Sequence, residues 1–361
     1  MSCLKNSRNL GIDFLRILSM FYVVILHTLG HGGILGAVSM GTYQYKTVWF
    51  LEIWAYCAVD IFALISGYVG YHEEKRTVKY SNYILLWEQV VFYGILVTFI
   101  LKFFYPESIS MLDMLGMLFP VTNGLYWYFT AYTGLFFCIP MVNIAMTKCS
   151  SNFAIKIFVA FIGVFSVYDI FVGRFNLERG YSFVWLLVLY VLGSVLKKCE
   201  IGKKINFLKA LIGIVLLILF TWIWKLYGIE YSFLGFRITK DTFVSYTSPT
   251  ILGAALFYII GFSKIQFNHF KKIISFAASG AFAVYLLNEH VFFRKFIIEQ
   301  NFVKWSESSA GMILVKVCVF SGIFIIVSII IDIGRQKLFK MLRLDCLAAV
   351  VEKRIKIITD R

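Results

Sequence analysis

Charged residues are scarce in this chain of 361 amino acids. They make up 15% of it, and hydrophobic residues make up 60%. A typical soluble domain has about 25% charged and about 45–50% apolar residues. One water-soluble core cannot hide that much apolar surface, so the composition excludes an ordinary soluble fold and indicates a membrane protein.

Proline is also scarce, with 4 residues, and this favours long uninterrupted helices. The apolar runs are continuous and about 20 residues long, whereas a β-barrel would show short alternating segments. We therefore predict an all-α fold, a polytopic bundle of about ten transmembrane helices. The predicted spans are 11–29, 48–70, 82–104, 126–145, 153–172, 181–197, 206–226, 246–263, 273–293 and 312–334.

The patterns that mark metal centres and disulfide scaffolds are missing. The 7 cysteines form no Cys-x-x-Cys pair and no metal-ligand spacing, so we expect no disulfide framework and no metal. The net charge of +15 does not indicate nucleic-acid binding, because the basic residues lie between the apolar runs. Most of them fall on the side that holds both termini, which predicts that both termini are cytoplasmic.

Two regions follow from the hydropathy. Residues 1–334 form the predicted transmembrane domain, and residues 335–361 a cytoplasmic basic tail. The tail mixes Leu, Val and Ile with Lys and Arg at helical spacing, which predicts an amphipathic helix on the inner membrane surface. A second apolar stretch at 111–121 is too short to span and is predicted to be a re-entrant or interfacial piece.

The first predicted span holds three ionisable residues, Asp13, Arg16 and His27. At roughly 100° per residue, eleven steps return His27 to within about 20° of Arg16, and Asp13 lies about 60° to the other side. Arg16 and His27 are then roughly 16 Å apart along the axis. This predicts one polar stripe through the membrane, a hypothesis of function because buried charge is costly. The alternative is that Asp13 pairs with Arg16 near the interface and His27 caps the outer end.

Two other ionisable residues have more than one interpretation. Asp60 lies in the middle of the second span, where it either pairs with Arg16 from the facing helix or stays protonated. His31 falls in an outer glycine-rich loop and is predicted to be solvated.

The run RNLGIDFLRILSMFYVVILH, residues 8–27, resembles the opening signature of the acyltransferase type 3 family: an arginine, an Ile-Asp pair, then an arginine followed by a histidine. The second-span run VDIFALISGYVGY, residues 59–71, is similar to the family's aromatic–Ser-Gly-Tyr segment. Weaker similarities are LYWYFTAY at 125–132, SYTSP at 245–249 and AVYLLNEH at 283–290. The resemblance covers nearly the whole chain.

The resemblance implies a membrane O-acetyltransferase in the plasma membrane. It would move an acyl group, usually acetyl, from cytoplasmic acyl-CoA to a hydroxyl of a cell-surface or lipid-linked saccharide. His27 would be the general base, since neutral imidazole accepts a proton near neutral pH, or it would carry the acyl group. Arg16 would anchor the donor or stabilise charge, and Asp13 would orient Arg16.

The predicted topology distributes further candidates between the two faces. The residues expected on the cytoplasmic side, where they suit the phosphates of coenzyme A, are Arg8, Ser66, Arg76 and Lys79. Those expected on the outer side, where they suit a sugar, are Trp127, Tyr128, Tyr285 and Glu289. Simpler interpretations also exist: Arg76 and Lys79 as orientation charges, and Trp127 and Tyr128 as interfacial aromatics.

Two positions depart from the family's pattern. Lys79 stands where members often have a second arginine, and lysine lacks the bidentate fork. Asn288 stands where members often have histidine, with His290 two residues later, so the resemblance assigns no role to His290.

Two other classes of function stay open at this point. One is a transporter or flippase for a glycan or lipid intermediate, and the other is a scaffold without catalysis. The partners expected for the enzyme are acyl-CoA, a saccharide and membrane lipids, with no nucleic acid. A homo-oligomer and a separate extracytoplasmic partner are both compatible with the sequence.

Overall fold

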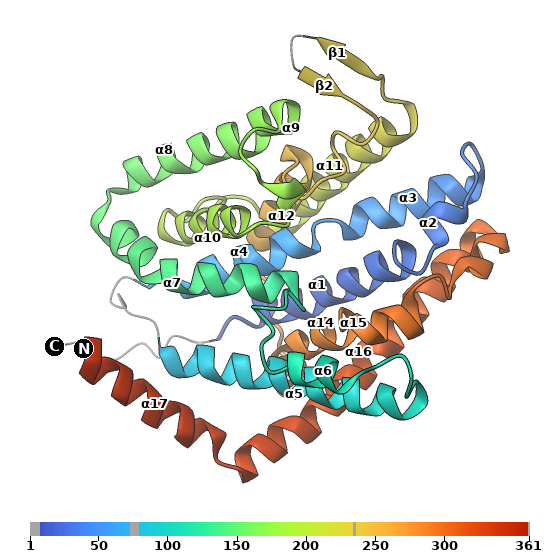
Figure 1. Ribbon diagram of the computed structural model, residues 1–361. Helices are drawn as coiled ribbons and strands as arrows, with labels where there is room; N and C mark the ends of the chain where they lie inside the picture. The colour runs from blue at the N-terminus through green and yellow to red at the C-terminus, as the bar shows by residue number, and fades with distance from the viewer. Residues whose placement is uncertain (1–7, 73–78, 234–235, 360–361) are drawn as a thin grey trace.

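The computed structural model describes residues 8–72, 79–233 and 236–359. Over these ranges the protein is nearly all-α, as predicted, and its helices pack side by side in one bundle (Figure 1). An antiparallel hairpin of β1 (Tyr231–Phe233) and β2 (Phe236–Ile238) projects from one end of the bundle.

Helix α1 (Leu10–Leu29) lies in the interior of the bundle. Asn9 caps it by accepting a hydrogen bond from the amide of Ile12, at 3.1 Å. The helix packs against α3 (Tyr43–Ala55), α4 (Ala58–Gly70), α12 (Pro249–Phe262), α13 (Lys271–Ser279), α14 (Ala281–Asn288) and α16 (Ala310–Met341). The polar residues of α1 therefore face other helices rather than lipid.

Helix α4 crosses α10 (Phe183–Lys198) closely at two glycines. A Cβ at Gly67 would lie 2.0 Å from the carbonyl oxygen of Tyr190, and one at Gly193 would lie 2.3 Å from that of Leu64. Small residues allow this approach, as they often do between membrane helices. The crossing fixes α4, and with it Ser66, beside α1.

The remaining elements complete the bundle. They are α2 (Ile34–Ala37), α5 (Tyr80–Phe104), α6 (Met111–Gly116), α7 (Trp127–Lys148), α8 (Ser151–Ile162), the π-helix η1 (Gly163–Tyr168), α9 (Asp169–Val172), η2 (Glu178–Gly180), α11 (Phe207–Tyr227), α15 (Val291–Phe293), the π-helix η3 (Arg294–Ile298), η4 (Val303–Glu307) and α17 (Leu344–Thr359). The predicted piece at 111–121 contains the short helix α6, whose Met111, Leu112 and Leu115 are exposed.

Seven helical segments in the described part of the chain are long and apolar enough to cross a membrane. They are Leu10–Leu29, Tyr43–Gly70, Tyr80–Phe104, Trp127–Lys148, Ser151–Val172, Phe207–Tyr227 and Ala310–Met341. A pair of helices bent by 58°, Lys271–Asn288 and Val291–Ile298, would make an eighth span. Helices α10 and α12, with 16 and 14 residues, are shorter than the roughly 20 residues of a perpendicular crossing. The count of ten and the cytoplasmic termini therefore stay predictions.

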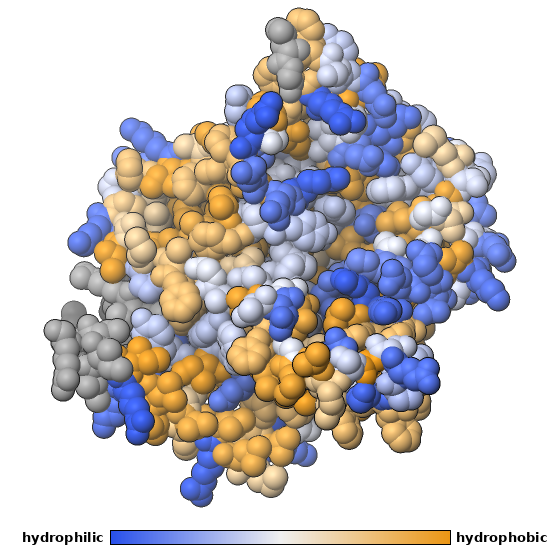
Figure 2. All heavy atoms as spheres, viewed as in Figure 1, coloured by the Kyte–Doolittle hydropathy of each residue, from blue (hydrophilic) through white to orange (hydrophobic). Residues whose placement is uncertain are grey.

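The surface has the character expected in lipid. Figure 2 shows apolar side chains spread over α8 and over the corner where α16 meets α17, and hydrophilic ones gathered below the hairpin. Exposed apolar residues of α16 include Val319, Ile323, Ile326 and Ile330. Helix α16 continues past residue 334 to Met341, and the tail then forms α17, which packs along α5.

Candidate functional site

A cavity of about 340 Å³ lies beside the first turns of α1, and we call it the Arg16 cavity. Its walls come from α1, α4, α5, α7, α13 and α14. It is lined by Arg8, Arg16, Phe62, Ser66, Leu86, Tyr128, Tyr132, Ala278, Ser279, Ala281 and Phe282. Of the four residues expected to hold the acyl donor, Arg8 and Ser66 line this cavity, together with Arg16.

Asp13 holds both arginines of the Arg16 cavity. Its carboxylate accepts hydrogen bonds from Arg8 Nε and, at 3.3 Å, from Arg16 Nη1. Arg8 also donates to the backbone oxygen of Ser275, at 3.1 Å. The Asp13 side chain is only 3% exposed, so one carboxylate faces two guanidinium groups in a largely dry setting. A net positive charge is left over, and it suits an anionic ligand.

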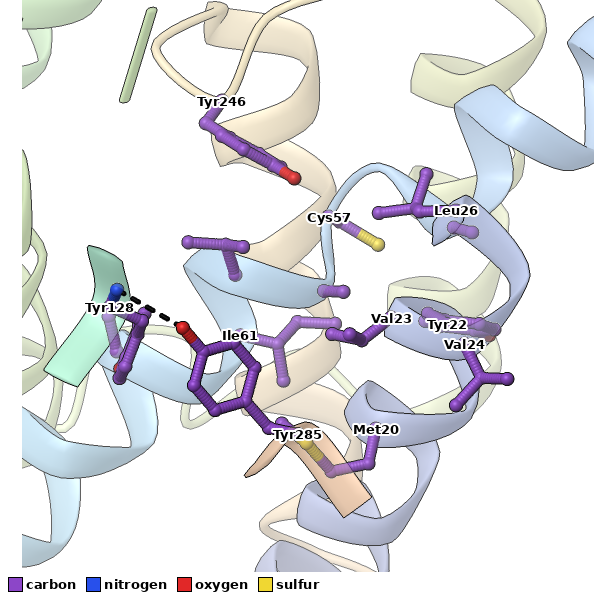
Figure 3. Close-up of a cluster of buried hydrophobic side chains, with 14 of the residues drawn as sticks. Met20, Tyr22, Val23, Val24, Leu26, Cys57, Ile61, Tyr128, Tyr246 and Tyr285 are labelled. Carbon is purple, nitrogen blue, oxygen red and sulfur yellow. Dashed lines mark hydrogen bonds between the residues drawn. The ribbon is translucent and has the colours of Figure 1, made fainter. Parts of the chain in front are cut away.

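A second, smaller cavity lies further along α1, and we call it the His27 cavity. It is lined by Met20, Val23, Leu26, His27, Ala58, Val59, Phe62, Trp127, Tyr128, Tyr181, Tyr246, Phe282 and Tyr285. Figure 3 shows the side chains of Tyr128, Tyr246 and Tyr285 around Met20 and Val23 of α1. The Tyr285 hydroxyl accepts a hydrogen bond from the amide of Tyr128, at 3.2 Å.

Three ring side chains line both cavities. They are Phe62 of α4, Tyr128 of α7 and Phe282 of α14, and together we call them the ring wall. The Phe62 and Tyr128 rings meet edge to face, with centroids 5.7 Å apart. Arg16 therefore lies on one side of a thin aromatic partition and His27 on the other, both on the interior face of α1.

The His27 imidazole is held by polar groups from a distant part of the chain. Its Nδ1 contacts the Oδ1 atom of Asn288 and lies 3.4 Å from Glu289 Oε2. The other carboxylate oxygen of Glu289 accepts from Arg294 Nη1, at 2.6 Å. The His31 ring lies beside His27, with centroids 5.0 Å apart.

These partners stand at the break between α14 and α15. His290 stabilises the break: its Nε2 lies 3.1 Å from the oxygen of Gly94, and its Nδ1 accepts from the amides of Phe292 and Phe293. Donation to Gly94 and acceptance at Nδ1 fit one neutral tautomer. Both ring nitrogens of His290 thus contact backbone groups, which favours a structural role.

The other predicted residues lie apart from these cavities or beyond description. Lys79 is the exposed N-cap residue of α5, and neither cavity has it in its described lining. Arg76 lies outside the described residues. Asp60 does not pair with Arg16; its Oδ1 accepts from Trp185 Nε1, at 3.0 Å. Asp60 is therefore paired with the indole of Trp185, a residue that no sequence pattern singles out, and not with the guanidinium group of Arg16.

Several residues of the site had no role in the sequence interpretation. From the sequence alone, Asn288 is a departure from the family's pattern, and Arg294 is a basic residue just after the predicted span 273–293. Both belong to the sequence N-E-H-V-F-F-R, where a cluster of polar residues interrupts an apolar run. That interruption is the signal that could have indicated a functional break in the helix.

A larger polar cavity, of about 650 Å³, lies near the hairpin. Arg179, Ser245 and Thr247 line it, whereas their neighbours Tyr181 and Tyr246 line the His27 cavity. The Tyr181 and Tyr246 hydroxyls can donate and accept hydrogen bonds. We call this polar cavity the vestibule.

Comparison with known proteins identifies one match. A sequence model described as an acyltransferase domain, that of the acyltransferase type 3 family, matches residues 9–333. No curated protein and no solved structure matches the chain. The matched range includes every described residue of both cavities except Arg8.

Proposed function

Because the chain belongs to the acyltransferase type 3 family of membrane acyltransferases, we propose that it transfers an acyl group, acetyl by preference, from acyl-CoA to a saccharide hydroxyl on the opposite face of the membrane. The observation that carries this proposal is the pair of cavities that meet at the ring wall. A transfer across a membrane needs a donor site and an acceptor site that share one thin boundary, and Phe62, Tyr128 and Phe282 form such a boundary.

The Arg16 cavity suits the donor. Coenzyme A carries phosphates, which bind guanidinium groups through charge-assisted hydrogen bonds. Arg8 and Arg16 are held in place by Asp13, which lowers the cost of ordering them when the donor binds. The acyl end of the donor would point toward the ring wall, past Ser66.

The vestibule, of about 650 Å³, has room for the acceptor, whereas the His27 cavity, of about 30 Å³, has room only for its reacting hydroxyl group unless the rings move apart. Trp127, Tyr181 and Tyr246 offer ring faces and hydroxyl groups, the combination that binds sugars by stacking and hydrogen bonding. The Tyr181–Tyr246 and Trp127–Tyr181 ring centroids lie 5.2 and 4.7 Å apart, so the three rings form one surface. A lipid-linked or cell-surface saccharide would enter through the vestibule.

His27 is the proposed base. If Nδ1 donates its proton to Asn288 Oδ1, then Nε2 is the unprotonated nitrogen. Nε2 would take the proton of the acceptor hydroxyl while the hydroxyl oxygen attacks the thioester carbonyl. The C–S bond then breaks, and the coenzyme A thiolate leaves with the proton from His27. In the alternative route Nε2 itself attacks the carbonyl, the C–S bond breaks and coenzyme A leaves as the thiolate. The acceptor hydroxyl oxygen then attacks the acyl carbon, the C–N bond to Nε2 breaks, and the hydroxyl proton passes to the released thiolate.

Glu289 has a clear part in either route. Its Oε2 lies near the His27 ring, so a carboxylate there stabilises the imidazolium that forms during the transfer. Arg294 fixes the orientation of this carboxylate. The sequence predicted Glu289 as a substrate-binding residue; the geometry favours a positioning role beside the base.

Membranes that contain the full chain, incubated with acetyl-CoA labelled in the acetyl group, test the proposal. We expect label in the saccharide fraction, and a loss of at least about 100-fold in the variant His27→Ala. His269→Ala is the matched control, because His269 is an exposed histidine outside both cavities.

Wild-type membranes that move a saccharide across the bilayer but never transfer label would overturn the proposal in favour of a transporter. Equal labelling by His27→Ala and wild type would leave the acyltransferase in place but remove His27 from its mechanism.

A further inference from the structure

Three groups that commonly bind metal ions meet at the outer end of α1. His27, His31 and Glu289 each offer one ligand atom, and these atoms lie within 4.8 Å of one another. The sequence predicted no metal site, because its cysteines lack metal spacing. The cluster arises instead from two histidines one helical turn apart and a glutamate from the break after α14.

The geometry fits a small tetrahedral ion. Zinc binds histidine nitrogen and carboxylate oxygen at about 2.0–2.2 Å, so neighbouring ligand atoms lie about 3.4 Å apart around a tetrahedral ion. His27 Nδ1 and Glu289 Oε2 are separated by 3.4 Å. The His31 side chain is exposed, so a small rotation can bring its nitrogen closer. Two histidines and one glutamate also make a known zinc ligand set with one open position.

Glu289 has a free atom for this purpose. Oε1 is engaged by Arg294, whereas Oε2 is buried and has no hydrogen-bond partner among the described residues. A buried carboxylate oxygen without a partner is costly, and a cation removes that cost. Arg294 would act as the outer hydrogen-bond donor that orients a ligating carboxylate, an arrangement common around metal sites.

The backbone that carries His31 is held independently of its side chain. The oxygen of His31 accepts from the amide of Gln300, at 3.0 Å, and the oxygen of Gly32 accepts from the amide of Phe302, at 3.1 Å. These bonds survive any substitution of the His31 side chain, so a variant there is expected to fold.

We infer that His27, His31 and Glu289 bind one Zn²⁺ ion at the outer end of α1, and that the bound ion blocks His27. Zinc on Nδ1 displaces the Asn288 contact and leaves the ring proton on Nε2. The nitrogen assigned as the base is then protonated and cannot accept the proton of a hydroxyl. The ion is therefore an inhibitor at this site and not a cofactor. The inhibitory half of the inference rests on the proposed function, whereas the binding half does not.

Binding is measured without any enzyme assay. The full chain, purified in detergent and freed of metal, is titrated with Zn²⁺ against a chromogenic zinc indicator. We expect one binding site. Its affinity for Zn²⁺ should fall at least about tenfold in His31→Ala and in Glu289→Gln and stay unchanged in His269→Ala. Co²⁺ in place of Zn²⁺ should give the intense visible absorption of tetrahedral cobalt in wild type and not in His31→Ala.

The same samples are used to measure inhibition. The quantity compared is the Zn²⁺ concentration that halves each variant's own rate of acyl transfer. We expect that concentration to rise at least about tenfold in His31→Ala. Equal zinc affinity in wild type and His31→Ala overturns the site. Tight binding with no inhibition overturns the blocking of His27. If no variant transfers acyl groups, the proposed function fails, and the indicator titration alone decides the site.

Discussion

The Nδ1 atom of His27 lies 3.4 Å from the Oε2 atom of Glu289, which joins the interior of α1 to the break between α14 and α15. Only 8% of the Glu289 side chain is accessible, so its charge acts on the imidazole of the proposed base in a medium that screens it weakly.

We expect Glu289→Gln to lower kcat about 10- to 100-fold and to change the KM for the saccharide little, because the loss falls on the imidazolium that forms during transfer. Steady-state kinetics with labelled acetyl-CoA give both constants. A large rise in KM with an unchanged kcat would instead support the substrate-binding role predicted from the sequence. Glu299→Gln, close in the chain but outside the described lining of both cavities, is the control.

Asp13→Asn tests the donor side. The substitution removes the charge that holds Arg8 and Arg16, so the two guanidinium groups are no longer ordered before the donor binds. We expect the KM for acetyl-CoA to rise about tenfold, which corresponds to about 1.4 kcal/mol. Glu200→Gln removes an exposed carboxylate that pairs with Lys203, and this control should leave the KM unchanged. An unaltered KM in Asp13→Asn would argue against an arginine-based donor site.

Phe62→Ala tests the ring wall. Removal of one of the three rings connects the Arg16 cavity to the His27 cavity, so water should reach the thioester. We expect hydrolysis of acetyl-CoA without acceptor to rise several-fold relative to saccharide acylation, measured as thiol release in the absence and presence of the saccharide.

The control for this variant is Phe137→Ala, since Phe137 is 60% exposed and lies outside the described lining of either cavity. If Phe62→Ala keeps the wild-type ratio of acetyl-CoA hydrolysis to saccharide acylation, these rings do not separate donor from acceptor.

Gly67→Ala tests the crossing of α4 and α10. The added methyl group would meet the Tyr190 carbonyl at 2.0 Å, so the helices must separate, at a cost of about 1–3 kcal/mol. We expect a lower Tm in detergent and less folded protein in the membrane.

Gly322→Ala in α16 is the matched control, because no described atom beyond its chain neighbours and the nearby backbone of its own helix lies within 4 Å of the added Cβ. Alanine is the better helix former, so this variant should be as stable as wild type or slightly more. Equal losses in both variants would mean that close packing at Gly67 is not the cause.

The sequence predicted what depends on local periodicity. Helical spacing placed Arg16 and His27 on one face of α1, and the structure has both lining interior cavities. The family, predicted from residues 8–27 and the later similarities, is confirmed. The structure also confirms a nearly all-α fold with seven helical segments long and apolar enough to cross a membrane in the described part of the chain, whereas the ten spans stay a prediction. These inferences need only the sequence of single helices, where side-chain directions follow from the backbone.

The sequence did not predict contacts between segments that lie far apart in the chain. Nothing near Asn288 indicates that it meets His27, and nothing near Trp185 indicates that it meets Asp60, because such pairs depend on how the helices pack. The position of the break was also missed, since neither proline nor glycine marks residues 288–291. Helices α10 and α12 are shorter than a typical span, so the spans predicted at 181–197 and 246–263 stay predictions.

The break after α14 has a further consequence for how this chain can vary. His290 satisfies the backbone groups that an interrupted helix exposes, and the two residues before it contact His27. A one-residue deletion within α14 would rotate Asn288 by about 100° around the helix axis and move it by about 1.5 Å. Natural variation in length should therefore be confined to the loops, such as the one that follows α16, while the distance in sequence between residues 281 and 290 stays constant.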